Sequence, residues 1–200
     1  MKRMFSKPLT LLVAAVLLTT GWIGGAELMR LDVQPQSKIR VEGTSSMHDW
    51  TCEVKAFTGS FETTPSGAQP ASALEALSRA QVTIPTSNLE CKNGTMNKKA
   101  LDALKAKQNP TIQYSLKSAQ VVSEGSDGWA TLKASGQLKI AGVEKPVTMT
   151  VKGKKVDEGF RFTGSTPLLM SDFGIAPPTA MLGAMKTGDA ITIHFDVVAR

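Results

Sequence analysis

The sequence has few of the residues that build disulfide-stapled or metal-bound folds. It contains two cysteines, Cys52 and Cys91, and two histidines, His48 and His194. Two thiols are too few for a disulfide scaffold or a four-thiolate zinc site, and metal sites need three or four convergent ligands. Aromatic residues are scarce, at 6%. Hydrophobic residues nevertheless reach 42% and charged residues 20%, which excludes wholesale disorder and predicts a single packed domain.

The longest apolar run stands at the N-terminus. Lys2, Arg3 and Lys7 precede an apolar stretch over residues 9–18, and small residues follow up to Ala26. This is the layout of a secretory signal peptide, and the run is shorter than the roughly 20 residues of a membrane-spanning helix. We expect a signal peptide over residues 1–26 and a mature domain over residues 27–200, periplasmic or secreted and soluble after cleavage. An uncleaved anchor is the alternative.

Removal of the signal peptide halves the net charge. Residues 1–26 carry three basic and no acidic residues, so the charge of +6 for the whole chain falls to +3. Nucleic-acid binding needs a clustered basic stripe, whereas the lysines near residues 98–107 and 152–155 fit a solvated face. The sequence also lacks a phosphate-cradling glycine loop and a dinucleotide fingerprint. We therefore expect no nucleic-acid partner and no cofactor of the nucleotide type.

Export would place the two cysteines where thiols oxidise. Cys52 and Cys91 lie about forty residues apart, and we predict a disulfide between them. Two separate buried thiols are the alternative, and a catalytic pair of Cys52 with His48 is disfavoured by the second cysteine. His48 and Asp49 are adjacent on a predicted strand, so they point to opposite faces, and no Gly-x-Ser-x-Gly elbow is present. We expect no enzymatic activity; a small hydrolase or isomerase would need His48 beside a nucleophile.

Apolar and polar residues alternate with period two along most of the mature chain, which predicts strands. The alternation covers residues 38–42, 81–84, 111–117, 131–140, 147–152 and 191–197, with glycine-containing turns between several of them. Two segments have helical features instead: residues 72–79, where Ser72 and Glu75 fit a capping box, and residues 96–107. The pattern predicts an all-β sandwich or barrel with one or two short helices.

The residues on the apolar faces of these strands are mostly slender. An eight-stranded barrel has room for its own side chains or for one elongated ligand. Ile, Val, Leu, Ala and Met leave more space than Phe or Trp would, which favours a ligand-binding barrel. A barrel filled by its own side chains remains the alternative, and it would make the protein an interaction or stress-response module without a lipid ligand.

Several segments, taken in order, resemble the YceI-like family of bacterial exported proteins. They are His48-Asp49-Trp50, residues 82–89, Met96-Asn97 with the helical stretch 100–104, residues 109–112, residues 136–147 and Ser171-Asp172-Phe173-Gly174-Ile175. The resemblance covers residues 31–198, and its most specific parts are residues 136–147 and the turn at Asp172. It implies a single antiparallel lipocalin-like β-barrel of about eight strands that holds an isoprenoid chain of polyprenyl or quinone type.

The resemblance and the strand pattern together predict a non-enzymatic carrier that buries a lipid in its barrel. Strand parity makes the following residues candidates for the lining: Ile39, Val41, Val82, Ile84, Ile112, Tyr114, Leu132, Leu138, Met149 and Phe195. Trp50, Phe173 and Met181 are candidates for the mouth. Many relatives carry an arginine two positions before the aspartate of the Asp-Phe-Gly turn; here that residue is Met170, so an anionic head group lacks one partner. A transient membrane contact and a homodimer stay open.

Overall fold

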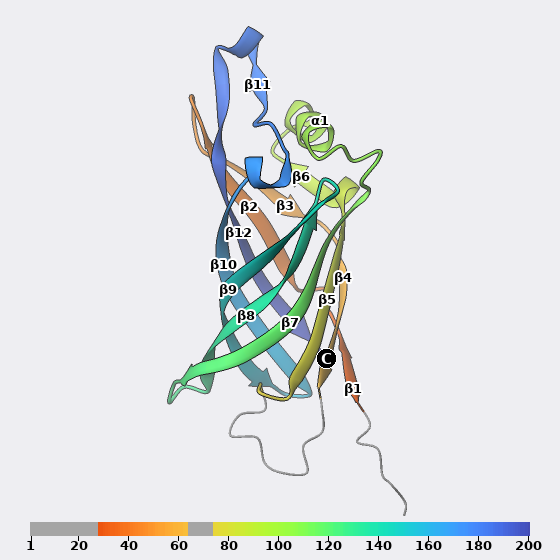
Figure 1. Ribbon diagram of the computed structural model, residues 1–200, viewed down its shortest axis with the longest axis vertical. Helices are drawn as coiled ribbons and strands as arrows, with labels where there is room; N and C mark the ends of the chain where they lie inside the picture. Colours follow the sequence, from red (N-terminus) through yellow and green to blue (C-terminus); the bar gives the residue numbers. More distant parts are fainter. Residues whose placement is uncertain (1–27, 64–73) are drawn as a thin grey trace, which may run out of the picture.

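A computed structural model describes residues 28–63 and 74–200, and most of them form antiparallel strands (Figure 1). The predicted signal peptide lies outside the described residues. In chain order the strands are β1 (Met29–Asp32), β2 (Lys38–Ser45), β3 (Trp50–Val54), β4 (Thr58–Thr63), β5 (Leu77–Pro85), β6 (Leu89–Cys91), β7 (Thr111–Glu124), β8 (Trp129–Ile140), β9 (Val143–Val156), β10 (Gly159–Leu169), β11 (Thr179–Ala180) and β12 (Met185–Ala199).

The strands form one strongly curled sheet in the order β1-β4-β5-β7-β8-β9-β10-β12-β2-β3-β6, and β11 pairs with β12. The sheet closes at the end where the C-terminus lies, which we call the lower end (Figure 1). There the backbone N–H of Asp32 donates to the carbonyl of Arg200 at 2.7 Å, and the N–H of Arg200 donates back at 3.0 Å. These bonds place β1 beside the end of β12. The predicted all-β, lipocalin-like barrel is confirmed.

The strand count differs from the prediction of about eight. The described residues contain twelve strands, because short breaks divide three long ones. Residues 33–37, which include Pro35, separate β1 from β2; residues 55–57 separate β3 from β4; a 3-10 turn, η1 (Thr86–Asn88), separates β5 from β6. Each break lets the chain change its pairing partner, so that β3 pairs with β2 and β6 whereas β4 pairs with β1 and β5.

One of the two predicted helices is present. Helix α1 (Gly94–Ala103) begins after Asn93, whose side chain accepts a hydrogen bond from the N–H of Met96 at 3.0 Å. It ends earlier than expected, because Lys105 takes a positive φ of 51°. The helix predicted over residues 72–79 is wrong from Leu77 onward, and residues 72–73 lie outside the described residues. Pairing of Glu62 with Arg79 and of Phe61 with Ala80 commits this segment to β5, which overrides its local capping pattern.

The interior of the barrel holds two apolar clusters at different heights. The lower cluster is formed by Leu31, Phe61, Leu74, Ala80, Leu116, Ala130, Leu132, Ala134, Val151, Phe160, Phe162, Val197 and Ala199. The upper cluster is formed by Leu104, Leu138, Ile140, Ala141, Met170, Phe173 and Ile175. Tyr114 packs against both of them. It therefore marks the level at which the two parts of the interior meet.

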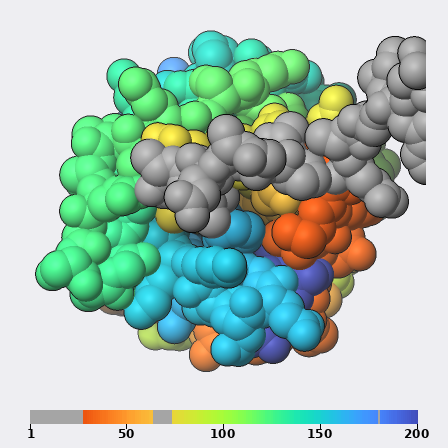
Figure 2. Space-filling view, turned by 90° about the horizontal axis from the view of Figure 1, so that it is seen from below, coloured from red at the N-terminus to blue at the C-terminus, as the bar shows by residue number. Residues whose placement is uncertain are grey.

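Aromatic packing makes the lower part dense. The rings of Phe61 and Phe162 stack with centroids 5.1 Å apart, and Phe160 lies 6.0 Å from Phe162. In a view of this end from below, β1 in orange-red, the turn between β9 and β10 in light blue and the turn between β7 and β8 in green lie around its rim (Figure 2). In the part of the chain that the structure describes, no helix is long and apolar enough to cross a membrane.

Candidate functional site

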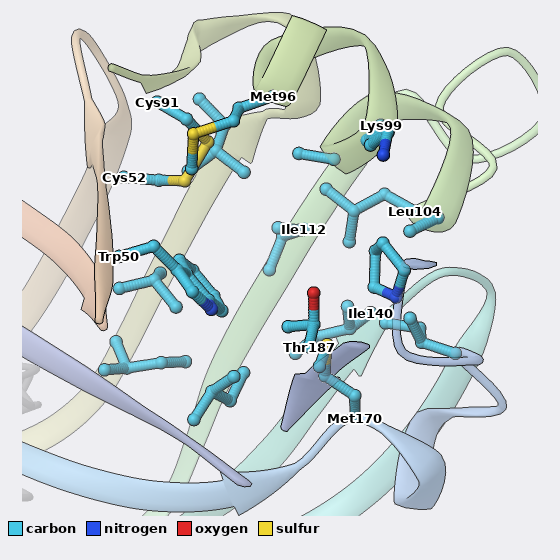
Figure 3. Close-up of a pocket in the computed structure, with 18 of the residues that line it drawn as sticks. Trp50, Cys52, Cys91, Met96, Lys99, Leu104, Ile112, Ile140, Met170 and Thr187 are labelled. Atoms are coloured by element: carbon cyan, nitrogen blue, oxygen red, sulfur yellow. A yellow bond between two sulfur atoms is a disulfide. The ribbon is translucent and has the colours of Figure 1, made fainter. Parts of the chain in front are cut away.

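An apolar cavity of about 200 Å³ occupies the upper part of the barrel (Figure 3). Strands from around the barrel, helix α1 and the segment after β10 all contribute to its wall. The lining residues are Ile39, Val41, Trp50, Cys52, Val54, Ile84, Leu89, Cys91, Met96, Lys99, Ala100, Ala103, Leu104, Ile112, Ile140, Met170, Phe173, Ile175, Pro178, Thr187, Ile191 and Ile193. Apart from Lys99 and Thr187, these side chains are apolar, so the cavity suits a hydrocarbon.

Alternation along β2 and β12 explains one wall of the cavity. Ile39 and Val41 line it from β2, and Ile191 and Ile193 line it from β12. Val41 is paired with Ile193, so their side chains share a face of the sheet. His194 points to the other face, where its Nε2 lies 2.9 Å from Oε2 of Glu42. The period-two pattern thus separates a slender apolar inner face from a polar outer one.

The indole of Trp50 is held by its cross-strand neighbour. Gly43 of β2 pairs with Trp50 of β3, and a Cβ at position 43 would overlap the indole ring. The ring Nε1 donates to the carbonyl of Thr44 at 3.0 Å. With its polar atom satisfied in this way, the indole presents an apolar surface to the cavity (Figure 3).

A disulfide joins Cys52 of β3 to Cys91 of β6 and forms part of the cavity wall. The two residues are directly opposite each other in the antiparallel pair, and both are buried. The bond leaves the chain without a free thiol, which removes the thiol that a catalytic pair with His48 would need. Among the described residues, no three His, Cys, Asp or Glu side chains come together as metal ligands. A disulfide is typical of a non-reducing compartment.

Helix α1 covers the upper end of the barrel and brings one cation to the cavity. Met96, Ala100 and Ala103 face the cavity from the helix, and Lys99 reaches its rim. The ammonium of Lys99 donates to the carbonyl of Thr179 at 2.9 Å, which ties the helix to the hairpin between β11 and β12. Figure 3 shows the Lys99 amine and the Thr187 hydroxyl among the apolar groups. These two groups could bind a polar end of a ligand.

The turn after β10, η2 (Ser171–Phe173), places Phe173 in the wall with only 3% of its surface exposed. Asp189 of β12 fixes this turn. Its carboxylate accepts from the backbone N–H of Ser171 at 2.8 Å and from the Ser171 hydroxyl at 2.5 Å. The Ser171 hydrogen bonds hold the pKa of Asp189 below its usual value. Met170, which precedes the turn, is buried and lines the cavity, so this wall offers no cation.

Tyr114 lies between the two clusters, at the level where packing gives way to the cavity. A Cβ at Gly136 would come within 2.7 Å of its ring, so the absence of a side chain in β8 makes room for it. Burial raises the pKa of the Tyr114 hydroxyl to about 12. The neutral phenol is therefore the form that the folded interior prefers.

The structure brings six of the thirteen predicted ligand-binding residues together in the cavity wall. They are Ile39, Val41, Trp50, Ile84, Ile112 and Phe173. Leu132, Met149 and Phe195 belong to the packed lower part, and Leu138 is buried in the upper cluster without lining the cavity. Val82 and Tyr114 also do not line it, and Met181 is 74% exposed. Strand parity identifies the inward face but not the height of a residue in the barrel, which explains this division.

Sequence reasoning predicted the disulfide and a helix after Asn93, but it did not place either of them in the cavity wall. Met96, Ala100 and Leu104 recur at helical spacing and are signals for a covering helix, but the pattern does not show what the helix covers. Ile191 and Ile193 alternate with polar residues, as Phe195 does, and could have been chosen on the same grounds. Lys99 and Thr187 have no signal of their own, because their position depends on how α1 and the β11–β12 hairpin meet.

Comparison with known proteins agrees with this architecture. BcnA from Burkholderia cenocepacia superimposes with a TM-score of 0.66 at 20% identity, covering 84% of this chain and 99% of that chain. A polyisoprenoid-binding domain from Saccharophagus degradans, implicated in plant cell wall breakdown, gives 0.66 at 10% identity, over 87% and 99%. The YceI protein of Campylobacter jejuni gives 0.57 at 21% identity, over 74% and 82%.

No curated protein sequence matches the chain. The profile of the YceI-like domain, in contrast, matches residues 32–199, which is nearly all of the part predicted to be mature. This match covers the whole cavity wall, the upper cluster and all of the lower cluster except Leu31. The chain therefore belongs to the family of YceI-like domain proteins.

Proposed function

We propose that this protein is an exported, non-enzymatic carrier that holds an isoprenoid or a similar lipid, of polyprenyl or quinone type, in its upper cavity. The observation that carries the proposal is the composition of the cavity wall, in which Lys99 and Thr187 are the two polar residues among 22. Each Å² of hydrocarbon removed from water there contributes about 25 cal/mol. The polyisoprenoid-binding domain of Saccharophagus degradans with the same fold supports this ligand class.

The size of the cavity limits how much of a ligand it can hold. An engineered apolar cavity of about 150 Å³ takes up a benzene molecule. A volume of about 200 Å³ therefore fits one or two five-carbon isoprene units, or a quinone-type ring. A longer chain would have to displace side chains such as Tyr114 at the floor, or extend out of the mouth. We propose that the six predicted residues in the wall contact the apolar part, and that Lys99 and Thr187 meet a carbonyl or hydroxyl group.

Native mass spectrometry of the protein isolated from its host without detergent tests the proposal. We expect the wild-type protein to carry a lipid, which organic extraction then identifies. Ile112→Trp fills the cavity and should abolish the bound mass, whereas Gln113→Trp, on the exposed face of the same strand, should retain it. Quenching of Trp50 fluorescence by an added quinone gives a second readout. A wild-type protein without lipid and without quenching would favour a filled interaction or stress-response module.

A further inference from the structure

Three large apolar side chains stand in solvent at the upper end of the molecule. Leu182 is fully exposed, Met181 is 74% exposed and Met47 is 66% exposed. Met181 and Leu182 form the tip of the hairpin between β11 and β12, which projects beyond the barrel (Figure 1). Met47 is in the turn between β2 and β3, next to Ser46, which exchanges two hydrogen bonds with Lys186 of the hairpin at 2.9 and 3.1 Å. We call these three residues the tip patch.

The tip patch adjoins the cavity rather than the packed end of the barrel. Pro178 and Thr187 lie on the two arms of the hairpin and both line the cavity. The N–H of Thr187 donates to the carbonyl of Pro178 at 3.1 Å, and Lys99 ties the hairpin to α1. A surface that contacts the tip patch would therefore lie next to the mouth through which a ligand enters.

The same end of the molecule is basic. Residues 92–109, which contain α1, carry five lysines and one acidic residue, and Lys186 is exposed on the hairpin. Within residues 28–63 and 74–200, none of Lys92, Lys98, Lys105, Lys107 and Lys186 has an ion pair. At the lower end the turns carry Glu124, Asp127, Asp157 and Glu158, which lie among basic residues such as Lys154, Lys155 and Arg200, so charges of both signs are mixed there. The charge therefore favours an anionic surface above the hairpin.

We propose that the tip patch inserts into the headgroup region of an anionic phospholipid bilayer, with the surrounding lysines on the lipid phosphates. Three side chains are too few for a stable protein interface, which buries roughly 800 Å² on each partner, but shallow apolar insertion with basic flanks is sufficient for reversible membrane binding. This orientation sets the cavity mouth against the bilayer, so that a lipid ligand crosses little water. The exchange of ligand rests on the proposed function, whereas docking itself does not.

Vesicle flotation tests the docking, with phosphatidylglycerol–phosphatidylethanolamine vesicles and phosphatidylcholine vesicles as probes. We expect the wild-type protein to bind the anionic vesicles, and to lose binding on phosphatidylcholine and in high salt. The double variant Met47→Ser with Leu182→Ser should bind at least about tenfold more weakly, because two exposed apolar side chains no longer insert. Val122→Ser is the matched control: Val122 is 65% exposed on β7 near the lower end and should change nothing.

The outcomes separate docking from ligand carriage. Absence of wild-type binding to anionic vesicles, or equal binding of the double variant and the wild type, would overturn the docking proposal. Native mass spectrometry of the same samples reports the cavity, and the double variant should keep its lipid. If the protein carries lipid but does not bind the vesicles, the docking proposal alone is refuted. If it binds the vesicles but holds no lipid, docking is supported and the carrier function is refuted.

Discussion

The lower and upper halves of this barrel are built from the same long strands, yet they fill their interiors differently. Five of the seven phenylalanines, residues 57, 61, 160, 162 and 195, pack in or against the lower cluster. On the upper strands the inward side chains are mainly isoleucine and valine, and an apolar cavity of about 200 Å³ remains among them. The comparison shows that the placement of a few aromatic rings decides where a barrel is solid and where it can take up a ligand.

The two halves also differ in what stabilises them. The lower half depends on close packing around Leu132, whose side chain is 2% exposed. The upper half lacks side chains where the cavity lies, and ties of another kind join its wall: the disulfide between Cys52 and Cys91, the bond from Lys99 to Thr179 and the bonds from Ser171 to Asp189. Such ties stabilise a wall without filling the space that it encloses.

Of the changes predicted for the two halves, removal of the disulfide should lower the free energy of unfolding most. Replacing Cys52 and Cys91 by alanine opens a loop of 39 residues, and we expect the free energy of unfolding to fall by about 3–4 kcal/mol. Urea denaturation measures the fall, and reduction of the wild-type protein should reproduce it. A loss below about 1 kcal/mol would show that the upper half does not depend on the cross-link.

A pair of matched truncations compares the halves directly. Leu132→Ala leaves a void in a packed core and should cost about 3 kcal/mol, within the usual range for buried leucine. Ile112→Ala removes a side chain that already borders empty space, and we expect about 1 kcal/mol. Chemical denaturation of the two variants gives both values. Equal costs would mean that the cavity wall is packed as tightly as the lower core.

Tyr114, which lies between the two halves, should make the stability of the protein fall at alkaline pH. The pKa of Tyr114 is about 12 in the folded protein against 10.0 for an ordinary tyrosine, and burial is the cause. Because the folded pKa is the higher one, this contribution is complete below pH 10 and is lost as the pH rises toward 12. We expect a loss of about 1–2 kcal/mol after allowance for partial exposure. Across this window the melting temperature of the wild type should fall relative to that of Tyr114→Phe, and parallel melts would contradict the assignment.

Much of the fold was predictable because strand alternation is a local property. The segments at residues 38–42, 111–117 and 191–197 all lie in strands of the structure. The helical assignment of residues 77–79 failed because pairing with β4 outweighs a local capping preference. The strand count differed because the partner exchanges at residues 33–37, 55–57 and 86–88 depend on the whole sheet.

The site was predictable only in part, for a related reason. Alternation determined which face of each strand turns inward, and it therefore selected Ile39, Val41 and Ile112 together with Leu132 and Phe195. The height of each residue in the barrel depends on strand register and tilt, which are set by contacts between distant segments.

The amino-acid sequence by itself determined the antiparallel all-β class, the cysteine pair available for a cross-link and the family to which the chain belongs. These follow from local periodicity and from motifs that stay together in the chain. The tertiary structure alone decided that five phenylalanines gather below Tyr114, that α1 covers the open end, and that Lys99 and Thr187 are the polar groups of an otherwise apolar wall. Volumes left empty inside a barrel arise where side chains from many strands fail to meet, and no single segment encodes that.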